Sequence, residues 1–192
     1  GRHLSDGNQA FWVCPLVEES EAIDAAAAED RAAILRQRFG SDCVGLVHAR
    51  MKCADKDAVM TSFASGELAV LVATTVIEVG VDVPNATLMI VEGAERFGLA
   101  QLHQLRGRVG RGGGASRCIL LRGQTLTETG RARLALMRET NDGFRIAEED
   151  LRLRGPGEIL GTRQSGEQNF RVASPEDVAE LGPIAQGDAR LL

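Results

Sequence analysis

The sequence predicts an α/β fold, a doubly wound parallel sheet, followed by a small C-terminal helical hairpin and a loop. Over the first 123 residues, short apolar runs alternate with amphipathic stretches of helical spacing. This alternation is typical of βαβ units. Several runs are apolar at nearly every position, as expected of parallel strands that are covered on both faces. The clearest of them occupy residues 68–73, 86–91 and 118–121.

Two further strands are expected nearer the N-terminus. Residues 1–8 are polar and are expected to form a loose lead-in. Residues 10–14 have the composition of a buried strand, which Pro15 ends. Residues 43–47 form the next apolar run. Together with the three runs above, these segments supply the strands of the sheet.

Two helices connect the first strands, over residues 22–39 and 55–63. Each has apolar residues at the spacing of one helix face. In the longer helix these residues are Ile23, Ala27 and Ile34, and in the shorter one they are Val59, Met60 and Phe63. Gly40 and Gly66 mark the ends of the two helices.

After Arg122 the pattern changes. Residues 126–137 and 143–153 are predicted helices, separated by the strong turn signal of residues 141–143. The glycine-rich, polar stretch 161–166 is unsuited to a regular element and is interpreted as a functional loop. The expected domains are the sheet domain, the helical hairpin with its loop, and a weakly patterned tail, over residues 1–123, 124–173 and 174–192.

The composition is that of a soluble protein with one sizeable core. Of its 192 residues, 44% are hydrophobic. No run is long and apolar enough to span a bilayer, and no signal-peptide pattern is present. We therefore expect a cytoplasmic protein with no membrane partner. The cysteines lack C-x-x-C spacing, so we expect free thiols and no metal site. They are Cys14, Cys43, Cys53 and Cys118.

The net charge is −5, but the charges are unevenly distributed. Six acids and no base lie between residues 18 and 30, whereas six arginines and no acid lie between residues 96 and 122. We therefore expect one acidic face and one strongly basic face. The chain has no tyrosine and one tryptophan, so platforms for base stacking are scarce. A nucleic acid would be contacted mainly through its backbone.

Parallel sheets of this kind place their ligand loops at the carboxyl ends of the strands. Here these loops are residues 48–51, 74–84 and 92–111. We expect the functional residues in them, where this fold usually carries its chemistry. Arg50, in the first loop, is a candidate contact for a phosphate, although an exposed arginine often has no specific role.

The loop after the third strand combines Thr74 and Thr75 with Gly80 and Asp82. Hydroxyls at a strand end can donate to a phosphate, and glycine allows close approach of a backbone. The aspartate could accept from a ribose hydroxyl. A turn closed by Asp82 and Pro84 would account for the same residues without any ligand.

The stretch from Gln104 to Arg111 has the spacing Gln-x-x-Gly-Arg-x-Gly-Arg. Arg108 and Arg111 present planar guanidinium groups, which suit phosphate oxygens. By composition alone, an arginine-rich helix end could equally be a solvated face. His103 lies inside the stretch and is interpreted as packing or orienting its neighbours, and Trp12 is interpreted as a core residue.

Taken together, the two segments resemble motifs V and VI of the second helicase superfamily. The resemblance implies a RecA-like sheet in which Arg108 and Arg111 reach the γ-phosphate of ATP and act in catalysis. It implies nucleotide contacts for Gln104, Gly80 and Asp82. It also implies that Thr74 and Thr75 contact the DNA backbone, and Arg50 is added to them as a candidate DNA contact.

Residues 150–166 closely resemble the translocation motif of the RecG family of branch-migration helicases. The resemblance extends through motifs V and VI to residues 12–21 and covers the chain up to about residue 173. It implies that Arg163 and Gln164 couple the nucleotide state to movement on duplex DNA. Without the family, the same stretch would be interpreted as a glycine-rich linker. Ala49 stands where the family suggests glycine, which concerns only the local loop geometry.

The chain lacks the Gly-x-x-x-x-Gly-Lys-[Ser/Thr] loop and the acid that hold the phosphates and Mg²⁺ in such motors. The arginines therefore form half of an active site, and we expect the C-terminal lobe of a larger protein, inactive alone. The resemblance implies ATP and Mg²⁺ as cofactors, with Mg²⁺ held mainly by the other lobe. The implied partners are branched double-stranded DNA, a first RecA-like lobe and an N-terminal wedge domain of the same protein, which is expected to be a monomer.

The implied enzyme is an ATP-dependent DNA helicase that remodels stalled forks and Holliday junctions in recombination and repair. Two alternatives remain open from the sequence. One is the transcription-repair coupling translocase, which shares motif VI and a related hairpin. The other is a non-enzymatic, helicase-like module that binds DNA or a partner protein.

Overall fold

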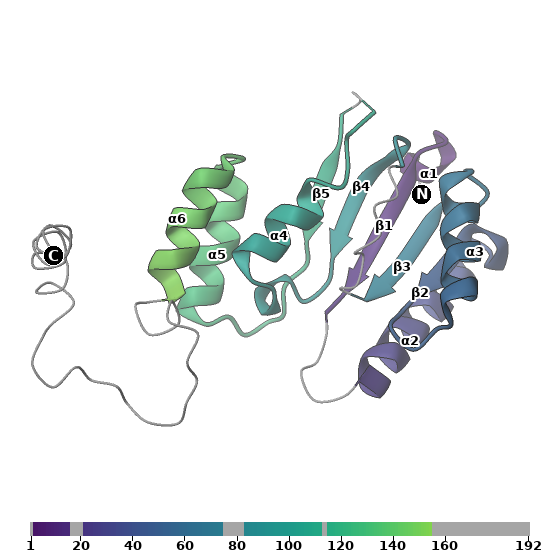
Figure 1. The fold of residues 1–192 in the computed structure, drawn as a ribbon, viewed down its shortest axis with the longest axis horizontal. Coiled ribbons are helices and arrows are strands. Elements are labelled where there is room, and N and C mark those ends of the chain that lie inside the picture. Colours follow the sequence, from purple (N-terminus) through teal and green to yellow (C-terminus); the bar gives the residue numbers. More distant parts are fainter. Residues whose placement is uncertain (1, 16–20, 75–82, 113–114, 155–192) are drawn as a thin grey trace, which may run out of the picture. The chain divides into compact units, whose positions relative to one another are not determined.

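The computed structural model of the chain (Figure 1) describes residues 2–15, 21–74, 83–112 and 115–154. The chain divides into two compact units, residues 1–147 and 148–192. The sheet and its connections belong to the first unit. In the second unit the described residues are 148–154, which are part of the last helix.

In the described part of the chain, five parallel strands form one sheet in the order β2-β3-β1-β4-β5. Each strand lies close to its predicted run, and the expected doubly wound parallel sheet is confirmed. The strands are β1 Gln9–Cys14, β2 Val44–Val47, β3 Val70–Thr74, β4 Ala86–Val91 and β5 Arg117–Leu120.

Helices cover both faces of this sheet. Because side chains alternate between the faces of a strand, Phe11 and Cys14 of β1 point in opposite directions. Cys14 shares a core cluster with Ala28 of α2 (Glu21–Phe39). On the other face, the ring of Phe63 in α3 (Cys53–Ala64) meets the ring of Phe11 edge-on, with 4.9 Å between centroids. Coverage from both sides accounts for the burial of β3 at every position.

The prediction that Ile23, Ala27 and Ile34 form the buried face of α2 is wrong. Ile23 and Ile34 are 53% and 52% exposed, and Ala27 is exposed with them. The helix packs instead through Ala25, Ala28, Ala32 and Leu35. An alanine-rich helix carries two stripes of apolar residues at helical spacing. The stripe of small residues allows a closer approach to the close-packed sheet, so the isoleucines are left outside.

The first residues are not a loose lead-in. A short helix, α1 (Arg2–Ser5), precedes β1, and Leu4 packs against the core cluster beneath α2. His3 Nε2 lies 3.1 Å from the hydroxyl of Thr87 in β4. These contacts, which periodicity alone does not reveal, hold the segment against the sheet.

β5 also departs from expectation, because its side chains are not covered on both faces. They alternate between exposed and half-buried, and Ile119 is 42% exposed. Among the described strands, β5 pairs only with β4, so it forms an edge of the sheet. An apolar run alone does not distinguish an edge strand from a central one.

The remaining helices are α4 Leu99–Arg106, α5 Glu128–Glu139 and α6 Gly143–Arg154, so both helices predicted beyond residue 124 are present. The side chain of Thr127 caps α5 by accepting a hydrogen bond from the Gly130 amide, at 3.0 Å. The Asp142 carboxylate accepts from the Phe144 amide at the start of α6, at 2.9 Å. Of the helices described, none has the length and apolar character that a membrane span requires.

Candidate functional site at two edges of the sheet

The carboxyl ends of the neighbouring strands β2 and β3 carry two of the predicted DNA contacts. Arg50 follows β2 and is exposed. Thr74 is the last residue of β3 and pairs in register with Cys14 of β1. Its side chain is buried, and its hydroxyl has no hydrogen-bond partner among the described residues. Thr75 lies outside the described residues. The structure therefore brings Arg50 and Thr74 to one edge of the sheet.

Arg108 and Arg111 lie at the opposite, amino edge. The amide of Gly110 donates to the carbonyl of Ala86, the first residue of β4, at 3.4 Å. A Cβ added to Gly112 would lie 2.7 Å from the carbonyl oxygen of Pro84, just before β4. The expectation that all three loops place their residues at the carboxyl edge is therefore wrong for these arginines. The segment begins at that edge but returns across the sheet.

Helix α4 makes this return. Its start is capped by the Gln101 side chain, which accepts a hydrogen bond from the Gly98 amide at 3.0 Å. Leu99, Leu102 and Leu105 are buried and bind the helix to the sheet. Gln104 faces outward and is exposed. Gly107 ends the helix, so Arg108 stands just beyond its C-terminus.

The two arginines differ in their surroundings. Arg108 is half-buried and has contacts of its own, whereas Arg111 is exposed and its Nε donates to the Gly107 carbonyl at 3.3 Å. The predicted nucleotide contacts Gly80 and Asp82 lie outside the described residues, as do Arg163 and Gln164. The chain is described again from Val83, whose carbonyl accepts from the Ala86 amide at the amino edge.

Arg106 is a residue that the sequence did not single out. Its Nη1 donates to the carbonyls of Met137 and Thr140 at the C-terminal end of α5, at 3.0 and 2.8 Å. Its Nη2 lies 3.1 Å from Nδ1 of His103. Carbonyls at a helix end lack intrahelical partners and favour a cation. Arg106 thus fastens α5 to α4, and His103 lies against it.

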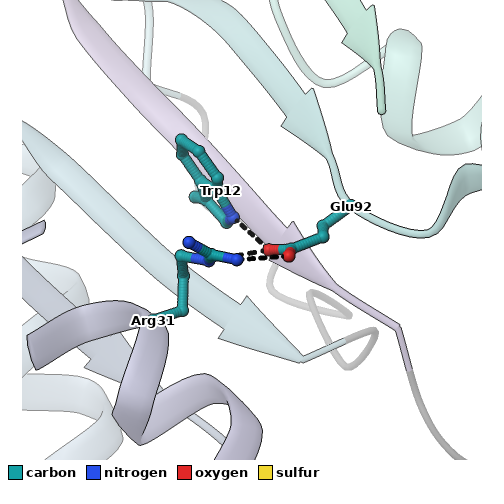
Figure 2. A network of polar contacts seen from close by, with 3 residues as sticks. All are labelled: Trp12, Arg31 and Glu92. Carbon is teal, nitrogen blue, oxygen red and sulfur yellow. Dashed lines mark hydrogen bonds and ion pairs between the residues drawn. The ribbon is translucent and has the colours of Figure 1, made fainter. Parts of the chain in front are cut away.

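A second network holds the carboxyl edge together (Figure 2). The indole of Trp12 in β1 donates to Glu92 Oε2 at 2.9 Å, and Arg31 Nε of α2 donates to the same oxygen at 2.8 Å. Arg31 Nη2 pairs with the other carboxylate oxygen. The guanidinium carbon lies 5.3 Å from the centre of the Trp12 ring. Trp12 is half-buried and packs against the core cluster, in agreement with its interpretation as a core residue, and its indole also forms a hydrogen bond that the sequence did not reveal.

The charges of this network set the protonation of its members. Burial alone would raise the pKa of Glu92, but the hydrogen bonds from Arg31 and Trp12 and the charge of Arg31 outweigh it, and the pKa is lowered. Burial, aided by the nearby charge of Glu92, raises the pKa of the Cys14 thiol to about 12. A protonated, buried thiol is unreactive. A cleft of about 540 Å³ lies beside the network.

Neither network has a signal in the sequence comparable to the glycine-flanked arginines. Arg106 adjoins Gly107 just as Arg108 does, so the sequence does not distinguish its role, and Arg31 and Glu92 are 61 residues apart. All four cysteines carry free thiols. In the part of the chain that the structure describes, no cluster of histidine, cysteine and acidic side chains is arranged to hold a metal ion.

The strand order, the returning helix and the arginines beyond it define the class of the chain, a RecA-like lobe of the helicase type. The chain belongs to the helicase conserved C-terminal domain family, which residues 2–113 match. Residues 140–186 match the C-terminal part of domain 3 of the ATP-dependent DNA helicase RecG.

The resemblance to RecG helicases is confirmed by similar sequences. The ATP-dependent DNA helicase RecG of Escherichia coli strain K12 is 61% identical over 170 residues, covering 88% of this chain and 24% of the relative. That of Acidithiobacillus ferridurans is 60% identical over 190 residues, covering 98% and 28%. That of Bacillus subtilis is 50% identical over 193 residues, covering 100% and 28%. The chain thus spans about a quarter of the length of these relatives.

Solved structures agree. RecG bound to a three-way DNA junction is similar with a TM-score of 0.68 and 46% identity, over 82% of this chain and 20% of that chain. The helicase MrfA bound to DNA has a TM-score of 0.55 and 16% identity, over 78% and 22% of the two chains. The second similarity shows the fold alone.

The first prediction concerns the turn that carries Arg111. Gly110→Ala is expected to destabilise the lobe more than Gly66→Ala. Both glycines have positive φ, +83° and +87°, so each alanine carries backbone strain of about 1–2 kcal/mol. Nothing lies within 4 Å of a Cβ at Gly66, but one at Gly110 would lie 2.7 Å from the Ser116 Cβ. We expect about 1–3 kcal/mol more loss at Gly110 in urea unfolding. Equal losses would contradict this turn geometry.

The second prediction concerns Arg106. Arg106→Gln removes hydrogen bonds from a cation to two carbonyls and should lower the free energy of unfolding by about 1–3 kcal/mol. Arg111→Gln is the matched control, because the exposed Arg111 makes a single long contact, and it should change stability by less than about 0.5 kcal/mol. Denaturant unfolding followed by circular dichroism measures both. Similar values for the two variants would show that Arg106 does not fasten α5.

The third prediction concerns Glu92 and pH. Because the pKa of Glu92 is lower in the folded chain than its ordinary 4.5, ionised Glu92 stabilises the fold above that pH. This stabilisation is lost as the pH falls through the lowered pKa. Glu92→Gln should therefore cost about 1–2 kcal/mol at neutral pH, and the difference from the natural chain should shrink in acid.

Urea unfolding at several pH values, followed by circular dichroism, tests this expectation. The control is Glu149→Gln, which removes an exposed pair with Arg152 on α6 and should have little effect at any pH. A loss for Glu92→Gln that persists unchanged below the pKa would show that the charge of Glu92 is not what stabilises the network.

Proposed function

We propose that the chain is the second motor lobe of an ATP-dependent double-stranded DNA translocase that remodels branched DNA. The observation that carries the proposal is the two-edged site. The candidate DNA contacts Arg50 and Thr74 lie at the carboxyl edge, the candidate catalytic arginines lie at the amino edge, and α4 joins the edges. The relatives are ATP-dependent DNA helicases, and the similar RecG structure holds a three-way DNA junction.

At the amino edge, Arg108 and Arg111 would reach across to the γ-phosphate of ATP bound to a first RecA-like lobe. Their guanidinium groups would stabilise charge on the transferring phosphoryl group. Gln104, Gly80 and Asp82 complete the proposed nucleotide contacts. The other lobe would supply the phosphate cradle and most of the Mg²⁺ ligands. This chain would therefore be inactive alone.

Arg50, at the carboxyl edge, would contact the DNA backbone, together with Thr74 and Thr75. The hydroxyl of Thr74 is buried in this structure, so its contact would require the end of β3 to open. Such contacts are tolerant of sequence and weaken with salt. Arg163 and Gln164 would couple the nucleotide state to movement along the duplex. The hydrogen bonds from Arg106 to the end of α5 support this coupling, because a shift of α4 would move α5 with it.

In the whole protein, an N-terminal wedge domain would hold the branch while the two lobes move the duplex. Stalled forks and Holliday junctions would be the substrates, in recombination and repair. We propose a monomer that acts in the cytoplasm. Two other functions are a transcription-repair coupling translocase and a static binding module. The following experiment distinguishes both from the proposed remodelling of branched DNA.

The fourth prediction concerns the arginines at the amino edge. The chain alone should show no ATP turnover, and adding the upstream lobe and wedge domain with forked DNA should restore it. In that mixture, Arg108→Ala or Arg111→Ala should lower turnover by roughly 10³–10⁵-fold, the range of arginine fingers. Arg38→Ala, an exposed arginine on α2, is the control and should leave turnover unchanged.

The outcomes discriminate among the functions. Turnover by the chain alone would place a complete phosphate site within it and overturn the two-lobe proposal. Turnover that survives Arg108→Ala would overturn the catalytic role. No turnover in the mixture, with the parts shown to associate, would favour a static module. Turnover without preference for forked over linear duplex would favour the transcription-coupled motor.

A further inference from the structure

A groove of about 810 Å³ runs beside β5. Its lining reaches Val109, so one end of the groove adjoins the amino-edge segment of Arg108 and Arg111. Consecutive residues of the strand line it, among them Cys118, Ile119 and Leu120. Because successive side chains point to opposite faces, a groove that touches all three follows the open edge of the strand. In the part of the sheet that the structure describes, that edge has no strand partner. Its backbone amides and carbonyls can receive an added strand.

The groove is strongly basic. Four arginines line it and no carboxylate does: Arg106, Arg122, Arg131 and Arg138. Arg131 and Arg138 are seven positions apart on α5, which places them on one face about 10 Å from each other. Both are exposed, and the side chain of neither forms a hydrogen bond or ion pair within the described part of the chain. Their charges are therefore available to a ligand.

The floor between these arginines is apolar. Leu134 lies between Arg131 and Arg138 on α5, and Val109 and Met137 complete the surface. No aromatic side chain lines the groove, so it offers no platform on which a base could stack. Arginine and methionine are enriched in protein interfaces, and an apolar floor has no counterpart in a phosphate backbone. These features favour a polypeptide over a nucleic acid.

We propose that this β5 groove binds an extended, acidic segment of a partner protein by strand addition. The segment would pair its backbone with the open edge of β5. In an extended chain, alternate side chains share a face, so acids could meet Arg122, Arg131 and Arg138. An apolar side chain between them would contact Leu134 and Met137. The groove also contains Arg106, so a bound segment would touch the contact between α4 and α5.

The test uses the 192-residue chain and a fluorescein-labelled synthetic peptide of alternating glutamate and valine. Fluorescence anisotropy should detect binding that weakens with salt. Arg131→Glu and Arg138→Glu should each weaken binding about tenfold or more. The matched control is Arg38→Glu, another exposed arginine, on α2, which should leave the affinity unchanged. Circular dichroism confirms that each variant is folded.

Two measurements test the binding mode without altering the chain. Bound peptide should slow alkylation of Cys118, which lines the groove, but not that of the exposed Cys53 on α3. A peptide with proline at alternate positions should lose binding, because proline lacks the amide that a strand ladder needs.

The proposal would be overturned by affinity that both charge reversals leave unchanged, or by alkylation of Cys118 that the peptide does not slow. It would also be overturned if proline substitutions had no effect, since the backbone would then not be recognised. Displacement of the peptide by duplex DNA that depends on Arg131 and Arg138 would assign the groove to nucleic acid instead. None of these outcomes depends on ATP turnover, so they are independent of the proposed motor function.

Discussion

The connection between β4 and β5 has to return from the carboxyl edge of the sheet to its amino edge, because parallel strands begin at the same edge. Helix α4 makes this crossing, bound to the sheet through Leu99, Leu102 and Leu105. It ends at Gly107, so the segment of Arg108 and Arg111 is delivered to the amino edge. The crossover that any parallel pair requires therefore also fixes the distance between the arginines and the carboxyl edge, where Arg50 and Thr74 lie.

This crossing segment is fastened at both ends by charged side chains. At its start, Glu92 accepts hydrogen bonds from Arg31 of α2 and from Trp12 of β1. At its end, Arg106 holds the terminal carbonyls of α5. Between the two, buried leucines prevent the helix from sliding on the sheet. A force applied at Arg108 would therefore reach α5 and the carboxyl edge through fixed contacts.

The strands and their parallel arrangement in one sheet could be predicted from the sequence, because short, continuous apolar runs that alternate with helical stretches are typical of buried parallel strands. The prediction of the buried helix face failed for α2, because two sets of apolar residues in this helix both have helical spacing. The alanines of α2, not Ile23 and Ile34, face the sheet, since the choice depends on how closely the helix approaches. The edge on which Arg108 lies follows from the direction of α4, which spacing does not encode. The Trp12–Glu92–Arg31 network joins residues that are distant in the chain, so no local pattern reveals it.

The open edge of β5 is a place where a second copy of the chain could add its own strand. Exposed edge strands tend to add a second copy of the same strand, and proteins commonly block this with charge. Here Arg131 and Arg138 on α5 face the edge, with Arg122 at the end of the strand, and no acid of the lining balances them. A second copy would bring the same arginines against these and be repelled. The positive charge that repels a second copy of β5 also favours an acidic segment. One set of arginines therefore protects the edge from self-pairing and gives it specificity for the proposed partner.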